Sequence, residues 1–67
     1  MLDRKQQLIN SVNYADFENF RREYERDKTS LNTIIREYII HKERKFRVDI
    51  DCEMYHELRQ RIEFFLS

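Results

Sequence analysis

The chain has 67 residues, which allows one domain at most, and its 13 basic and 13 acidic side chains give a formal net charge of zero. A strongly basic balance, which would indicate nucleic-acid binding, is missing, although a neutral total leaves room for a local basic patch. No signal peptide or membrane-spanning run is present. The single cysteine suits a reducing compartment, so we expect a cytoplasmic protein without internal disulfides.

The size and residue types also bear on catalysis and assembly. A chain this short seldom builds a sufficient core alone, so we expect a homodimer. Glycine and proline are absent, and a phosphate-binding loop or a shaped pocket usually needs glycine. The soft metal ligands are His41, Cys52 and His56, which are too few and too scattered for a typical zinc site. We therefore expect no enzymatic activity, no metal and no cofactor.

The first 13 residues are ambiguous between two structures. Over residues 7–12, Leu8, Asn10 and Val12 would face the same side of a short strand. The same segment would also fit the end of a helix that begins near Asp3. We favour a strand or an extended segment.

A helix is predicted from Tyr14 to about Asp27. Asn13 is a suitable N-cap, and Asp16 follows it by three residues in the manner of a capping box. The apolar positions of this helix form one narrow stripe, which consists of Phe17, Phe20 and Tyr24.

The next predicted helix is the most apolar element of the chain. Thr29 or Ser30 would cap it, and it would run from Leu31 to about Lys42. Its apolar side chains have the spacing of a wide helical face; they are Leu31, Ile34, Ile35, Tyr38 and Ile39. We expect this face to form the core of a dimer. The polar run 41–45 would be a linker or a continuation of the helix.

The hydrophobic period then changes from two residues to that of a helix. Phe46, Val48 and Ile50 alternate with polar residues, which predicts a half-buried strand over 46–50. Asp51 lies where an N-cap belongs, ahead of an amphipathic helix over 52–66. A short strand that leads into a helix cannot satisfy its edges alone, so its simplest partner is a second copy of the chain.

With this pattern the chain resembles the ribbon-helix-helix family of small DNA-binding regulators, a class that includes phage and plasmid repressors. Residues 6–43 are similar to a strand-helix-helix unit of that family, and residues 45–67 are similar to its strand and first helix. The resemblance implies an α+β, mostly helical fold: one short strand and three amphipathic helices in an intertwined dimer. The better strand, 46–50, has no second helix after it, so whether it or 7–12 forms the ribbon stays open.

The resemblance also implies a mechanism, in which paired strands read the major groove of double-stranded DNA to regulate transcription. For a ribbon over 46–50, the outward residues are Lys45, Arg47 and Asp49; for a ribbon over 7–12, they are Gln7, Ile9 and Ser11. Amides near Thr29 and Ser30 would hold a phosphate at the start of the second helix. Lys45 and Arg47 could instead be edge-strand charges that prevent aggregation.

A protein-interaction module without DNA binding is the alternative function. Such an antitoxin-like or inhibitory partner would suit the zero net charge and a C-terminal strand and helix that could join another protein. The apolar end 64–66 would then contact the partner, whereas in a homodimer it would be part of the core.

Overall fold

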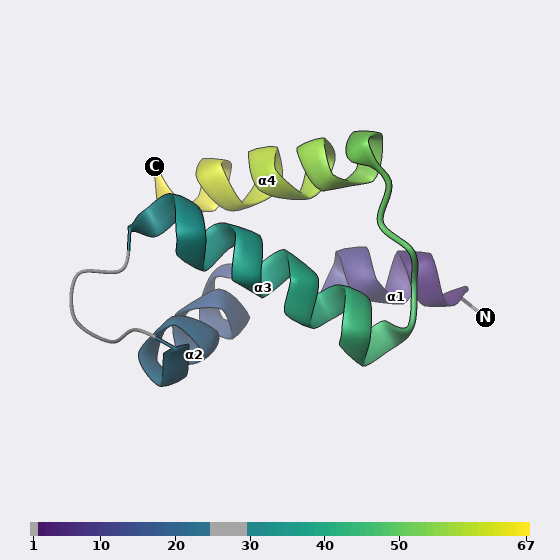
Figure 1. Cartoon of the computed structure of the whole chain (residues 1–67), viewed down its shortest axis with the longest axis horizontal. Helices are drawn as coiled ribbons and strands as arrows, with labels where there is room; N and C mark the ends of the chain where they lie inside the picture. Colours follow the sequence, from purple (N-terminus) through teal and green to yellow (C-terminus); the bar gives the residue numbers. More distant parts are fainter. Residues whose placement is uncertain (1, 25–29) are drawn as a thin grey trace.

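The computed structural model describes residues 2–24 and 30–67, and in this part of the chain the secondary structure consists of α-helices joined by short connections (Figure 1). The elements within it are α1 (Arg4–Ser11), α2 (Tyr14–Tyr24), α3 (Leu31–Phe46) and α4 (Cys52–Leu66). The predicted α+β fold with a strand ribbon is therefore wrong: no strand occurs in the described ranges. The domain prediction is not affected, since all four helices share one core.

Helix α1 occupies the segment for which we favoured a strand. Asp3 caps it, because one carboxylate oxygen accepts a hydrogen bond from the Gln6 amide at 2.8 Å. Leu8 and Val12, four residues apart, are both buried, while Asn10 between them is exposed. A strand would have turned all three to one side. The four-residue spacing of a helical face, and not the two-residue alternation, describes this segment.

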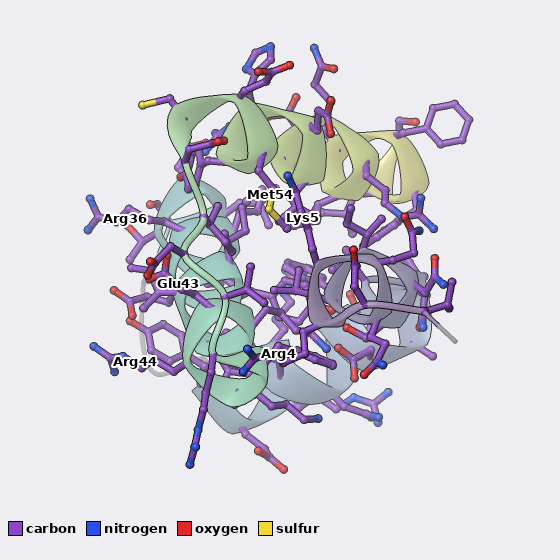
Figure 2. All side chains as sticks on the ribbon, turned by 90° about the vertical axis from the view of Figure 1, so that its right-hand side faces the viewer. Arg4, Lys5, Arg36, Glu43, Arg44 and Met54 are labelled. Atoms are coloured by element: carbon purple, nitrogen blue, oxygen red, sulfur yellow. The ribbon has the colours of Figure 1, made fainter. Side chains whose placement is uncertain are left out.

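Helix α3 lies at the centre, and each of the other three helices packs against it. Ile34, Ile35, Tyr38 and Ile39 are almost completely buried, as the spacing of this apolar face predicted. Their neighbours come from the same chain, however, and not from a second subunit. Figure 2 shows Met54 of α4 pointing inward to this core, while Arg36 of α3 points outward. The expectation of an intertwined dimer built on α3 is thus wrong.

The segment 46–50, predicted as a strand, ends α3 and then connects it to α4. Phe46 is the last residue of α3, and Arg47 takes the left-handed conformation with φ of 55°. The backbone of this connection bonds to α3 and not to a second strand: the Val48 amide donates to the Glu43 carbonyl, and the Ile50 amide donates to Glu43 Oε2 at 2.9 Å. The alternation of Phe46, Val48 and Ile50 reflects an extended connector with one side laid on the core.

Hydrogen bonds confirm the predicted helix starts. Asn13 Oδ1 accepts from the Asp16 amide at 2.9 Å, and Ser30 Oγ accepts from the Thr33 amide at 3.2 Å. Asp51 Oδ1 accepts from the Met54 amide at 2.8 Å. In a chain without glycine, these short polar side chains define where the helices begin.

The left-handed residue at the end of α3 gives a test of this connection. Replacing Arg47 by glycine should raise the free energy of unfolding by about 1 kcal/mol, because the Cβ atom is what disfavours a positive φ. Urea unfolding followed by circular dichroism measures the change. Arg47→Ala keeps the Cβ atom and removes the charge, so it should leave stability nearly unchanged; an equal gain in both variants would contradict the backbone explanation.

Candidate functional site

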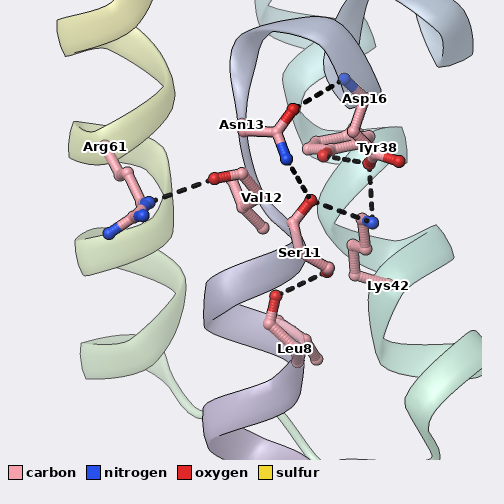
Figure 3. A network of polar contacts seen from close by, with 8 residues as sticks. All are labelled: Leu8, Ser11, Val12, Asn13, Asp16, Tyr38, Lys42 and Arg61. Carbon is pink, nitrogen blue, oxygen red and sulfur yellow. Dashed lines mark hydrogen bonds and ion pairs between the residues drawn. The ribbon is translucent and has the colours of Figure 1, made fainter.

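A buried lysine joins three helices at the middle of the molecule (Figure 3). Lys42 of α3 is 1% exposed, and its Nζ lies 2.6 Å from Oδ2 of Asp16 in α2. The Tyr38 hydroxyl donates to the same oxygen at 2.5 Å. Lys42 Nζ also lies 3.5 Å from the carbonyl oxygen of Ser11, the last residue of α1. The ammonium group therefore links α1, α2 and α3.

The electrostatics of this group follow from its burial and its partners. Burial acts to raise the pKa of Asp16, but the hydrogen bonds from Lys42 and Tyr38 and the positive charge of Lys42 outweigh it, so the pKa lies below its ordinary value of 3.8. Burial and the adjacent Asp16 carboxylate raise the pKa of Tyr38 above its ordinary value. Lys42 Nζ also lies over the Tyr38 ring, 5.3 Å from its centroid. Asp16 is thus a carboxylate, and Tyr38 stays a neutral hydrogen-bond donor.

A cleft of about 370 Å³ opens beside this group, between α2 and α3. The stacked rings of Phe20 and Tyr24, 5.5 Å apart, form part of its wall, and the His41 ring lies 5.3 Å from Phe20. Its charged lining residues have both signs, and they are Asp16, Glu23, Lys42 and Lys45. The acid nearest the core is already paired with Lys42, so this cleft has no dominant charge for a ligand.

A second cleft, of about 380 Å³, is bordered by aromatic side chains at the end of α4. Its lining consists of Val12, Asn13, Tyr14, Arg61, Phe64 and Phe65. Phe64 is 82% exposed and Tyr14 is 54% exposed, although both are large apolar side chains. We call Tyr14, Phe64 and Phe65 the aromatic patch. It is the place in the described structure where large exposed rings gather around a hollow.

Two ring contacts of Phe65 and one hydrogen bond of Arg61 hold the aromatic patch in place. The Phe65 ring is half-buried and lies edge-on to Tyr14, with 6.1 Å between the ring centroids, and at 5.9 Å from the buried ring of Phe17. Arg61 Nε donates to the Val12 carbonyl at 3.1 Å, which joins α4 to the connection between α1 and α2 (Figure 3). Within the apolar end 64–66, Phe65 and Leu66 thus pack on the chain's own core, whereas Phe64 faces outward.

The residues predicted to contact DNA lie at two different places. Lys45, Arg47 and Asp49 are exposed around the end of α3 and the following connector. Ser30 lies at the other end of α3, where its hydroxyl caps the helix. A helix of 16 residues is about 24 Å long, so this distance separates the predicted base-reading residues from the predicted phosphate contact. Thr29 lies outside the described residues.

Sequence reasoning placed Lys42 in a polar run and did not single out Tyr14. A signal for Lys42 exists in the spacing, because it lies seven residues after Ile35 and four after Tyr38 on the buried face of α3. Tyr14 has no comparable signal, since its exposure depends on how α2 and α4 pack.

The metal and membrane features can be stated for the described ranges 2–24 and 30–67. No group of three or more His, Cys, Asp or Glu side chains lies together there in a way that could hold a metal ion. Cys52 is a free, exposed thiol, and His56 contacts Gln60 on the surface of α4. None of the helices in these ranges is both long and apolar enough to span a membrane.

Comparisons with known proteins identify no relatives. No protein-family model, curated protein or solved structure gives a significant match to the chain.

The buried ion pair predicts unequal effects of removing its two members. Asp16→Asn leaves Lys42 buried without a counter-charge and should lower the free energy of unfolding by about 3 kcal/mol. Lys42→Met should lower the free energy of unfolding by about 2 kcal/mol less than Asp16→Asn does. It removes the buried charge and leaves the partly exposed Asp16 in contact with water. Urea unfolding of both variants and of the double variant measures these values.

The double variant is the control for this comparison. It should be close in stability to Lys42→Met alone, since Asp16→Asn does little harm once the ammonium group is gone. Equal losses in the two single variants would contradict the assignment of the cost to an unpaired lysine.

Proposed function

We propose that this chain is a protein-interaction domain, not an enzyme, and that it binds a partner protein through the aromatic patch. One observation carries the proposal: Phe64, 82% exposed, borders a cleft of about 380 Å³ together with the exposed ring of Tyr14. Single exposed apolar residues are common on soluble proteins, but large rings clustered around a hollow are typical of a binding surface.

The energetics of the aromatic patch support this proposal. Burying one phenylalanine side chain contributes about 1.5–3 kcal/mol, and Phe64 is almost entirely available for burial. Aromatic side chains lose little conformational entropy on binding and are enriched where interfaces gain most of their free energy. Phe65 and Arg61 already hold the last turn of α4 against the rest of the chain, so binding would not have to order this surface.

The pairing of the polar side chains also supports an interaction role. Every buried side-chain nitrogen or oxygen in the described ranges has a hydrogen-bond partner within the chain. The Lys42–Asp16–Tyr38 group is paired internally and supports a structural role. An inhibitory or antitoxin-like protein, which acts by occupying a partner's surface, needs no reactive group of its own. The lone exposed Cys52 is consistent with action in the reducing cytoplasm.

Duplex DNA is a second candidate ligand, on a different surface and without a strand ribbon. Three exposed basic side chains, Arg44, Lys45 and Arg47, lie within four residues at the end of α3. Arg44 points away from the helix into solvent (Figure 2). Asp49 is exposed two residues beyond Arg47 and opposes this positive charge. The basic cluster supports at most a weak contact with phosphates, and we rank DNA below a protein partner.

Affinity capture with three forms of the chain tests the protein-interaction proposal. The wild-type chain, Phe64→Ser and Leu2→Ser would each be used as bait, and calorimetry would then measure the affinity of purified candidate partners. Leu2 is a matched control, because it is 53% exposed and lies near the N-terminus, at the opposite end of the molecule from the C-terminus (Figure 1). We expect Phe64→Ser to weaken binding by a factor of about ten or more and Leu2→Ser to leave it unchanged. A partner that binds all three forms equally would contradict the proposal.

Fluorescence anisotropy with a mixed-sequence duplex tests the second candidate. Any binding should be measurable at low salt only and should fall steeply as salt is added, because it would depend on phosphate neutralisation. Exchanging Arg44, Lys45 and Arg47 for glutamine together should abolish it, while Arg36→Gln, an exposed basic residue on the middle of α3, should not. Binding that persists at physiological salt would place DNA above a protein partner.

A further inference from the structure

From the shape of the aromatic patch we infer that its partner includes a second copy of this chain, with Phe64 of each copy inserted into the cleft of the other. The inference deepens the proposed function and rests on it. It differs from the dimer predicted by sequence, because it involves neither a strand ribbon nor the buried face of α3.

The patch has a projecting ring and a hollow side by side. Phe64 is 82% exposed and forms one border of the cleft, while the buried side chain of Val12 and the half-buried ring of Phe65 also line it. A two-fold interface brings the same surface of both copies together, so each feature must find its complement on that same surface. A projection beside a hollow meets this requirement, since each copy donates one ring and receives one. A different partner would need to match only one of the two features.

The chemistry of the cleft suits a phenyl ring. Tyr14 and Phe65 offer ring edges and faces to an incoming aromatic group, which prefers edge-on or offset contacts. Arg61 also lines the cleft, and its Nε is held by the Val12 carbonyl at 3.1 Å. Its guanidinium group would therefore be available against the face of the incoming ring in a defined position. Phe64 of a second copy supplies the apolar and π-electron character that this lining would recognise.

The arrangement of α4 allows the exchange to be mutual. Arg61 and Phe64 are three residues apart and lie on neighbouring positions of the outer face of α4. If two α4 helices meet in opposite directions near these residues, Phe64 of each copy comes to Arg61 of the other. The same geometry closes after two copies, so it does not lead to longer assemblies.

The extent of the patch sets the expected strength. A few aromatic side chains on each side bury less surface than the roughly 1,600 Å² of a standard stable interface, so the dimer should be weak and form in the micromolar range. The monomer keeps its own core, and dissociation would not unfold it.

Sedimentation equilibrium, over concentrations from about 10 µM to 1 mM, tests the inference. A reductant would be present, because the exposed thiol of Cys52 could otherwise cross-link two copies. We expect the wild-type chain and Leu2→Ser to shift from monomer to dimer over this range. Phe64→Ser should raise the dissociation constant by a factor of about ten or more. Its circular dichroism spectrum should be unchanged, since little of Phe64 is buried in the monomer.

Isotope-filtered nuclear Overhauser spectra of a mixed labelled and unlabelled sample give the second measurement. They should show contacts between Phe64 ring protons of one copy and Tyr14 or Phe65 of the other. A wild-type chain that stays monomeric at the highest concentration would overturn the inference, as would a dimer that is insensitive to Phe64→Ser, lacks these contacts or grows into larger assemblies. If the chain is monomeric but Phe64→Ser still loses a different captured protein, the second copy is excluded and the protein-interaction function is retained.

Discussion

Burial of the apolar face of α3 is the constraint on which the rest of this structure depends. The other three helices contact α3 and are held in place by it, so each must present its own apolar stripe to the same central element. In a chain of 67 residues this arrangement uses most of the large aliphatic side chains, and the core contains residues from every helix. The apolar face of α3, which would have suited an intertwined dimer, is covered by the other helices of the same chain. The core therefore needs no second subunit to complete it.

Lys42 fixes the relative positions of the helices within this apolar packing. Aliphatic side chains tolerate small shifts and rotations between helices, whereas an ammonium group in the core requires its partners at specific positions. Here the carboxylate comes from the first turn of α2 and a carbonyl oxygen from the last residue of α1. A sliding of either helix along α3 would separate the charge from its partners, so the ion pair favours one register of the three helices over its neighbours. The desolvation of Lys42 opposes folding, and the gain lies in selectivity among packings more than in total stability.

The sequence allowed most of the helical structure to be predicted, because that part depends on local spacing and capping. Asn13, Ser30 and Asp51 cap helices as expected, and the stripe of α3 is buried as its spacing predicted. The strand over 46–50 was wrong because an extended connector with one side on a core has the same two-residue alternation as a strand. Only the hydrogen-bond partner differs: the Ile50 amide donates to the side chain of Glu43 in α3, seven residues earlier, and not to a neighbouring strand. The strand predicted over 7–12 was wrong because the four-residue spacing of Leu8 and Val12 fits both the two-residue period of a strand and the period of a helix.

The binding surface could be predicted only in part, and helix geometry explains which part. Each residue of a helix is rotated by about 100° from the one before it, so Phe64 lies about 200° around α4 from Ile62. Leu58, Ile62 and Phe65 fall on one side of the helix and are buried or half-buried against the core. Once that side faces inward, Phe64 must face outward, whatever the finer details of packing. The exposure of Phe64 in the described structure therefore follows from the order of residues in α4. The position of Tyr14 beside it depends on α2 crossing the end of α4, a relation between distant segments that no local pattern contains.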